Sequence, residues 1–98
     1  MDFEEPLTSG FTIYSKSGCH NCTKFKKLLK ENNLFFLEIQ CDDYLIEEKE
    51  RFLSFIENKI GKSWVTFPMV FNDGKFIGGY IEASAIVHKL LLSFEDMF

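Results

Sequence analysis

The order of two hydrophobic periodicities along the chain is the feature that most constrains its fold. Residues 11–15 alternate and are rich in β-forming side chains, as expected for a strand. From Cys22 the apolar residues recur at helical spacing as far as Asn32-Asn33, and residues 34–39 form a second apolar run of strand length. A strand, a helix and a strand in this order form a parallel pair through a right-handed crossover. This part of the chain therefore predicts a parallel β-α-β unit.

A second helix and a β-hairpin are predicted next. Residues 42–60 begin with an acidic helix start and carry apolar side chains at helical spacing as far as Gly61. Pro68 stands where a strand can begin, and it opens residues 69–77, which are interrupted by the turn-forming residues 72–74. Two antiparallel strands are therefore expected after the helix.

A last helix completes a fold of the α/β class. After Gly78-Gly79, residues 83–91 carry a regular helical stripe of apolar side chains. The order β-α-β-α-β-β-α combines a parallel unit with an antiparallel hairpin, so it predicts a mixed four-stranded sheet flanked by helices. The chain has 98 residues, of which 46% are hydrophobic, and this fits one core. Residues 1–98 are expected to form a single domain, with residues 1–10 as a lead-in.

Charge and the length of the apolar runs argue against two kinds of partner. The formal net charge is −4 and no basic stripe is present, so nucleic acid is not expected as a partner. No apolar run approaches the ~18 residues of a membrane span. The first residues resemble neither a secretory signal nor a transit peptide. The expectation is a monomeric protein of the cytoplasm.

Three cysteines point to the chemistry. Cys19 and Cys22 form a Cys-x-x-Cys pair, and Cys41 stands alone. Three cysteines are too few for a disulfide scaffold, and a close pair in a reducing compartment indicates either metal binding or redox chemistry. Zinc sites of this type use a second pair of ligands, which neither the two histidines nor Cys41 supplies at a matching spacing. Redox chemistry is therefore favoured, no metal is expected, and Cys41 is expected to be a small buried hydrophobe.

The predicted helix start gives the two paired thiols different roles. Side chains at positions i and i+3 lie on one side of the first turn, close enough to form a disulfide. Unpaired N–H groups, the helix dipole and the nearby Lys16 favour the thiolate of Cys19, which is expected to be the nucleophile. Cys22 lies on the apolar stripe, where the charged form is disfavoured. It is expected to be the resolving thiol.

Three segments resemble the signatures of glutaredoxins, in the same order. They are residues 15–22 (Ser-Lys-Ser-Gly-Cys-His-Asn-Cys), residues 66–71 (Thr-Phe-Pro-Met-Val-Phe) and residues 74–80 (Gly-Lys-Phe-Ile-Gly-Gly-Tyr). The resemblance implies the thioredoxin fold and the reduction of protein disulfides and glutathione mixed disulfides, with glutathione as co-substrate. It also makes Cys19 the thiolate that accepts glutathione.

The resemblance further implies a set of glutathione-binding residues. These are Lys16, Thr66, Phe67, Pro68, Gly79, Tyr80 and Glu82. Lys16 would contact a carboxylate of the tripeptide, and the backbone of Phe67 would pair with it as one more strand, at the bend of a cis-proline. The segment that ends at Glu82 would hold the γ-glutamyl end, where glycine allows close approach of the backbone.

Three departures from the family pattern keep other functions open. His20-Asn21 stands where many members have Pro-Tyr, Val65 where some have arginine, and Ile81 where many have a polar helix cap. Lys62 is the candidate to supply the positive charge that the arginine would carry. One alternative is a thioredoxin-like electron donor that does not use glutathione, for instance to a ribonucleotide reductase. Another is a dimer that carries a [2Fe–2S] cluster.

Overall fold

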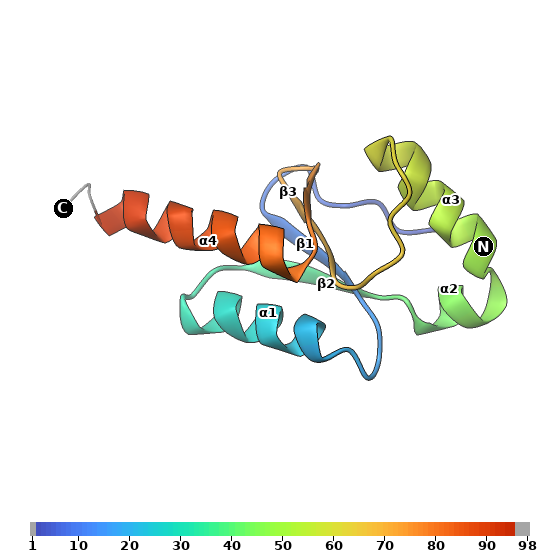
Figure 1. Ribbon diagram of the computed structural model, residues 1–98, viewed down its shortest axis with the longest axis horizontal. Helices are drawn as coiled ribbons and strands as arrows, with labels where there is room; N and C mark the ends of the chain where they lie inside the picture. The colour runs from blue at the N-terminus through green and yellow to red at the C-terminus, as the bar shows by residue number, and fades with distance from the viewer. Residues whose placement is uncertain (1, 96–98) are drawn as a thin grey trace.

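The computed structural model describes residues 2–95, and its elements follow the predicted order with one exception. The strands are β1 (Phe11–Ser15), β2 (Phe36–Gln40), β3 (Met69–Asn72) and β4 (Lys75–Gly78), and the helices are α1 (His20–Glu31), α2 (Asp42–Glu47), α3 (Lys49–Ile60) and α4 (Tyr80–Glu95). The sheet order is β2-β1-β3-β4, with β1 parallel to β2 and antiparallel to β3 (Figure 1). The mixed four-stranded sheet predicted from the sequence is confirmed.

The exception is the single helix predicted over residues 42–60, which is two helices. Glu48 has φ −144° and ψ 47°, outside the helical region, so α2 ends there and α3 starts at the next residue. The break lets Tyr44 and Phe52 both pack against Phe3, with ring centroids 4.9 and 5.5 Å from it. Leu45 and Phe52 lie seven residues apart, close to two helical turns, so the apolar pattern runs through the break without a visible interruption.

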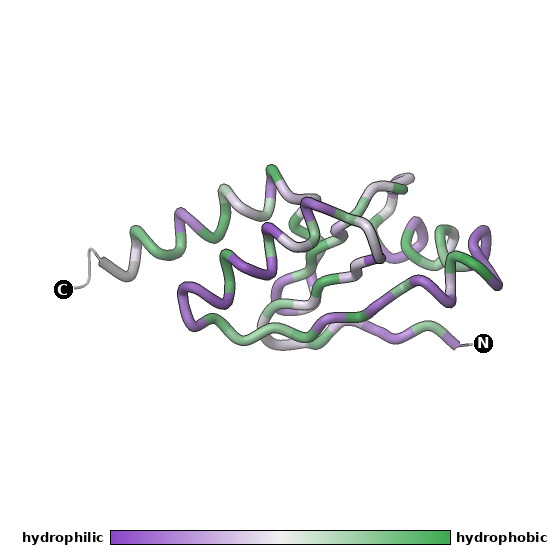
Figure 2. The backbone as a smooth tube through the Cα atoms, turned by 90° about the horizontal axis from the view of Figure 1, so that it is seen from below, coloured by the Kyte–Doolittle hydropathy of each residue, from purple (hydrophilic) through white to green (hydrophobic). Residues whose placement is uncertain are grey.

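Two apolar clusters hold helices on opposite faces of the sheet. On one face, Ile13 of β1 packs with Phe25 of α1 and Val87 of α4. On the other, its neighbour Tyr14 packs with Phe52 of α3, because successive residues of a strand point to opposite faces. Figure 1 shows α1 and α4 together on one side of the sheet and α3 on the other. In Figure 2 the turns of α1 alternate between hydrophilic and hydrophobic residues, as expected for a helix with one buried side.

The predicted hairpin is also confirmed. Asp73 and Gly74 have positive φ values of 53° and 80°, as a two-residue turn between antiparallel strands requires. The N-terminal lead-in is fixed to this turn, because the N–H of Gly10 donates to Oδ1 of Asp73 at 2.7 Å. Within residues 2–95, no helix has the length and apolar character needed to cross a membrane.

Candidate active site

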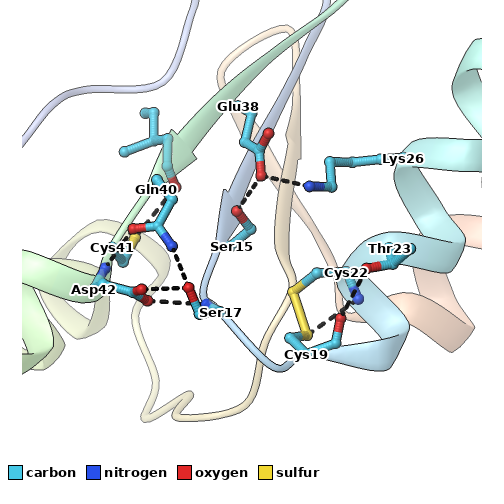
Figure 3. Close-up of polar contacts among 11 residues, drawn as sticks. Ser15, Ser17, Cys19, Cys22, Thr23, Lys26, Glu38, Gln40, Cys41 and Asp42 are labelled. Carbon is cyan, nitrogen blue, oxygen red and sulfur yellow. Dashed lines mark hydrogen bonds and ion pairs between the residues drawn. A yellow bond between two sulfur atoms is a disulfide. The ribbon is translucent and has the colours of Figure 1, made fainter.

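The paired cysteines lie at the N-terminus of α1: Cys19 ends the loop that follows β1, and Cys22 is in the first turn of the helix. Cys19 is the N-cap residue, and its Sγ accepts a hydrogen bond from the backbone N–H of Cys22 at 3.1 Å. The two residues form a disulfide, with their Cα atoms 5.2 Å apart (Figure 3). Cys19 is partly exposed, whereas Cys22 is only 1% exposed. A partner in solution can therefore reach the first sulfur far more easily than the second.

The loop before Cys19 is held by a network of hydrogen bonds to the start of α2. Asp42 accepts the backbone N–H of Ser17 at 2.9 Å with one carboxylate oxygen and the Ser17 hydroxyl at 2.5 Å with the other. Gln40 donates to the same hydroxyl at 3.3 Å and accepts the N–H of Asp42 at 2.8 Å. The hydrogen bonds from Ser17 lower the pKa of Asp42. A carboxylate on a helix start thus fixes the backbone two residues before the exposed cysteine.

A second polar group lies on the other side of the same loop. Glu38 of β2 accepts a hydrogen bond from the Ser15 hydroxyl at 2.6 Å and forms an ion pair with Lys26 of α1 at 2.7 Å (Figure 3). Burial acts to raise the pKa of Glu38, but the hydrogen bonds from Lys26 and Ser15 outweigh it and lower this pKa overall. These residues and both cysteines line one pocket of about 480 Å³. The Lys26–Glu38 ion pair therefore lines the same pocket as the disulfide.

The residues assigned to glutathione come from the loop after β1, the loop before β3 and the start of α4. The Nζ of Lys16 lies 5.9 Å from the centroid of the Phe67 ring. The Phe67-Pro68 peptide bond is cis, as the resemblance implies, and Pro68 is buried while Thr66 is exposed. Gly79 lies beside Pro68 and Trp64: an added Cβ would be in ordinary contact with the carbonyl oxygen of Pro68 at 3.6 Å and in tight contact with the Trp64 ring at 3.3 Å.

The start of α4 is organised by Glu82. Its carboxylate accepts the backbone N–H of Gly79 at 2.9 Å, so it satisfies one of the unpaired donors at the start of its own helix. Gly78 has a φ of +115°, and a Cβ at this position would collide with the Glu82 side chain. The neighbouring Tyr80 ring has the ammonium of Lys24 4.7 Å from its centroid, which brings α1 against this turn. Glu82 thus shapes the turn where the resemblance places one end of glutathione.

Two other residues singled out in the sequence lie away from the Lys16 side of the site. Lys62, the candidate replacement cation, has its Nζ 5.6 Å from the centroid of the Trp64 ring and lines a separate pocket with Glu82. Lys62 therefore lines a different pocket from Lys16. Cys41 is fully buried, as predicted, and its thiol donates to the carbonyl of Ile39 at 3.4 Å. Burial raises the pKa of Cys41 to about 12, which keeps this thiol protonated at neutral pH.

The sequence patterns did not predict the polar groups that surround the disulfide. The sequence predicts Asp42 only as part of a helix start, and it assigns no role to Glu38 or Lys26. The one available signal was Glu38 itself, a charged residue within a short apolar run of strand length. Among residues 2–95, no three His, Cys, Asp or Glu side chains form a group able to hold a metal ion.

Comparison with known proteins agrees with this architecture. The family model for Glutaredoxin matches residues 11–77. Glutaredoxin 1 of Rickettsia felis is 39% identical over 67 residues, which cover 68% of this chain and 61% of that protein. The chain thus spans about three fifths of the length of this curated relative.

Solved structures give the same result for the fold. The crystal structure of glutaredoxin 1 from Francisella tularensis complexed with cacodylate superposes with a TM-score of 0.71 at 32% identity, covering 83% of this chain and 94% of that one. A buckwheat glutaredoxin–glutathione complex superposes with a TM-score of 0.69 at 23% identity, covering 84% of this chain and 71% of that one. The second likeness shows the thioredoxin-like fold alone.

Proposed function

The chain belongs to the glutaredoxin family, and from that premise we propose that it is a dithiol oxidoreductase that reduces protein disulfides and glutathione mixed disulfides. The observation that carries the proposal is the position of Cys19 at the N-cap of α1. Its Sγ accepts the N–H of Cys22 even within the disulfide, and the same donor is available to the thiolate after reduction. The helix dipole adds to this stabilisation. Cys19 is therefore the nucleophile, and the buried Cys22 is the resolving thiol.

A glutathione mixed disulfide is reduced through Cys19 alone. The Cys19 thiolate attacks the glutathione sulfur and forms a new disulfide with it, while the substrate thiolate leaves and takes a proton from solvent. A second glutathione thiolate attacks the glutathione sulfur of this adduct. The products are oxidised glutathione and the regenerated Cys19 thiolate.

A protein disulfide requires both cysteines. Cys19 attacks one substrate sulfur and releases the other as a thiolate. Cys22 then loses its proton and attacks the Cys19 sulfur, which releases the second substrate thiol and leaves the Cys19–Cys22 disulfide. Two glutathione molecules reduce this disulfide in turn and are converted to oxidised glutathione.

Glutathione is proposed to lie between Lys16 and the start of α4. Lys16 provides an ammonium for the glycyl carboxylate, beside the Phe67 ring. The backbone of Phe67, before the cis Pro68, pairs with the extended tripeptide, and Thr66 borders it. Gly79, Tyr80 and Glu82 surround the γ-glutamyl end. We also propose that the protein is a monomer of the cytoplasm; a buried Cys41 outside any disulfide is compatible with that reducing compartment.

Reduction of the oxidised protein by glutathione tests the proposal most directly. The protein is incubated with excess glutathione, quenched with a thiol-alkylating reagent and weighed by mass spectrometry. We expect alkylation of both Cys19 and Cys22. If dithiothreitol reduces the disulfide and glutathione does not, the thioredoxin-like donor, with a partner such as ribonucleotide reductase, replaces this function. Visible absorbance of the purified protein would instead identify a [2Fe–2S] carrier.

A further inference from the structure

An apolar pocket opens beside Lys16, at the end of the proposed groove that receives the glycyl carboxylate. It measures about 440 Å³, within the range of ligand pockets in proteins. Its lining residues are Lys16, Leu45, Lys49, Leu53, Val65 and Phe67. The pocket continues directly from the proposed glutathione site, because Lys16 and Phe67 belong to both.

The charged side chains that line the pocket are all positive. Lys16 and Lys49 line it, no acidic residue does, and neither lysine forms an ion pair within residues 2–95. The acidic neighbours of the two lysines lie outside the pocket lining: Asp42, held by Ser17, interacts with the charge of Lys16, and Lys49 shares a neighbouring pocket with Glu47, Glu48 and Glu50. In a chain of net charge −4, this local excess of positive charge is suited to an anionic ligand.

Helix stability does not explain the position of Lys49. It is the first residue of α3, where the helix dipole makes a positive charge unfavourable. In contrast, the ion-paired Lys26 and Lys59 lie within or near the end of their helices and contact acidic side chains. A role of the Lys49 ammonium in binding a ligand in the pocket would explain why a lysine is found at the start of α3.

The walls of the pocket are larger and more apolar than a glycine requires. Leu45 and Leu53 are half-buried, and Val65 is 59% exposed beside them. Glycine has no side chain to contact these surfaces, so glutathione would leave them in water. A bulky apolar side chain at the same place would bury them, which is favourable in proportion to the area covered.

We propose that this pocket, formed by Lys16, Lys49, Leu53 and Val65, selects protein disulfides in which the reacting cysteine is followed by a bulky apolar residue and a carboxylate. The apolar side chain packs against Leu53 and Val65. The carboxylate, from the chain end or an acidic residue, lies between the two ammonium groups. The inference rests on the proposed oxidoreductase function and deepens it, since it names the substrate class of the same site.

Two synthetic mixed disulfides that differ in one residue test the inference. One contains γ-Glu-Cys-Gly and the other γ-Glu-Cys-Leu, each joined to the same reporter thiol, and each is also made with an amidated C-terminus. We expect kcat/KM to be about three- to tenfold higher for the leucine peptide, because a pocket discriminates side chains by the apolar area they bury. Amidation should remove part of the activity with both peptides.

The variant Lys49→Met tests the contribution of the second ammonium. It should lower kcat/KM for the leucine acid by about threefold and leave the leucine amide unchanged. Lys75→Met is the matched control, because Lys75 is an exposed lysine in β4, next to the hairpin turn, and should change neither value.

A leucine-to-glycine ratio of one or below, or equal effects of Lys49→Met on acid and amide, would overturn the inference while leaving the oxidoreductase function intact. Absence of turnover with every mixed disulfide would instead count against the proposed function itself.

Discussion

The ammonium of Lys26 lies 2.7 Å from a carboxylate oxygen of Glu38, in the pocket that both paired cysteines line. Lys26 follows Cys22 by one helical turn on α1, and Glu38 comes from the neighbouring strand β2. The carboxylate thus neutralises a cation that would otherwise stabilise a thiolate in this pocket. We therefore expect a change of charge at Lys26 or Glu38 to change the reduction potential of the Cys19–Cys22 disulfide.

Substitution of Glu38 and substitution of Lys26 should shift the reduction potential of the Cys19–Cys22 disulfide in opposite directions. Glu38→Gln keeps an acceptor for Ser15 and leaves the Lys26 ammonium unpaired, which stabilises the reduced, thiolate-containing form. We expect a potential about 10–20 mV higher, since 30 mV corresponds to about 1.4 kcal/mol and a partly exposed charge contributes less than that. Lys26→Met should lower it. Equilibration with glutathione buffers measures both, and shifts of the same sign would contradict the explanation.

Reduced Cys19 should ionise more readily than an ordinary thiol. The N–H of Cys22 and the start of α1 stabilise its thiolate, so we expect its pKa to lie below the ~8.5 of free cysteine. Thiolate absorbance is followed against pH in Cys22→Ser, with Cys19→Ser/Cys22→Ser as the control that contains only Cys41. A midpoint at or above 8.5 would remove Cys19 from the role of nucleophile.

The three cysteines should separate the two activities. Cys22→Ser is expected to retain turnover of a glutathionylated peptide, because a second glutathione resolves the Cys19 adduct, and to lose most reduction of insulin disulfides. Cys19→Ser should lose both activities, and Cys41→Ser should change neither by much. Both substrates are assayed for all three variants. Activity in Cys19→Ser would show that the roles are assigned wrongly.

Recognition of glutathione should depend on charge at both ends of the groove. Glu82→Gln keeps an acceptor for the Gly79 N–H, so it tests the charge of Glu82 without removing its hydrogen bond. Glu82→Gln and Lys16→Ala, each as a single substitution, should raise KM for a glutathione mixed disulfide about three- to tenfold. Reduction of the oxidised protein by dithiothreitol should be unchanged in both. Lys75→Ala serves as the control. Wild-type KM in both variants would favour the thioredoxin-like donor.

Stability should fall at alkaline pH in part through Cys41. Burial raises its pKa to about 12, whereas in the unfolded chain the thiol ionises near ~8.5. Between these values the unfolded chain has lost a proton that the folded protein retains, so the stabilisation is complete below the unfolded pKa and decreases as pH rises. Burial also raises the pKa of Tyr14, so the decrease has a second contribution.

Urea unfolding of the oxidised protein between pH 8 and 11 measures this dependence. Cys41→Ala should show a shallower decrease in the free energy of unfolding with pH than the wild type, whatever its absolute stability. Parallel curves for the two proteins would show that Cys41 does not contribute.

The sequence by itself determined the elements and the reacting pair. Hydrophobic period, turn residues and helix-start signals act over a few positions, so they placed Cys19 at the first turn of α1 and predicted the hairpin at Asp73-Gly74. They could not reveal the break at Glu48, because the apolar spacing continues through it and the break is favoured by packing of both helices on Phe3.

The surroundings of the pair were decided only by the tertiary structure. Lys26 meets Glu38 across 12 positions of the chain, and Ser17 meets Asp42 across 25. Both contacts require the crossover from β1 through α1 to β2, whose register is set by burial of apolar side chains along the whole sheet. Lys16 and Lys49 share a pocket for the same reason. Local sequence carries no record of such pairings, because the residues become neighbours only once the core has formed.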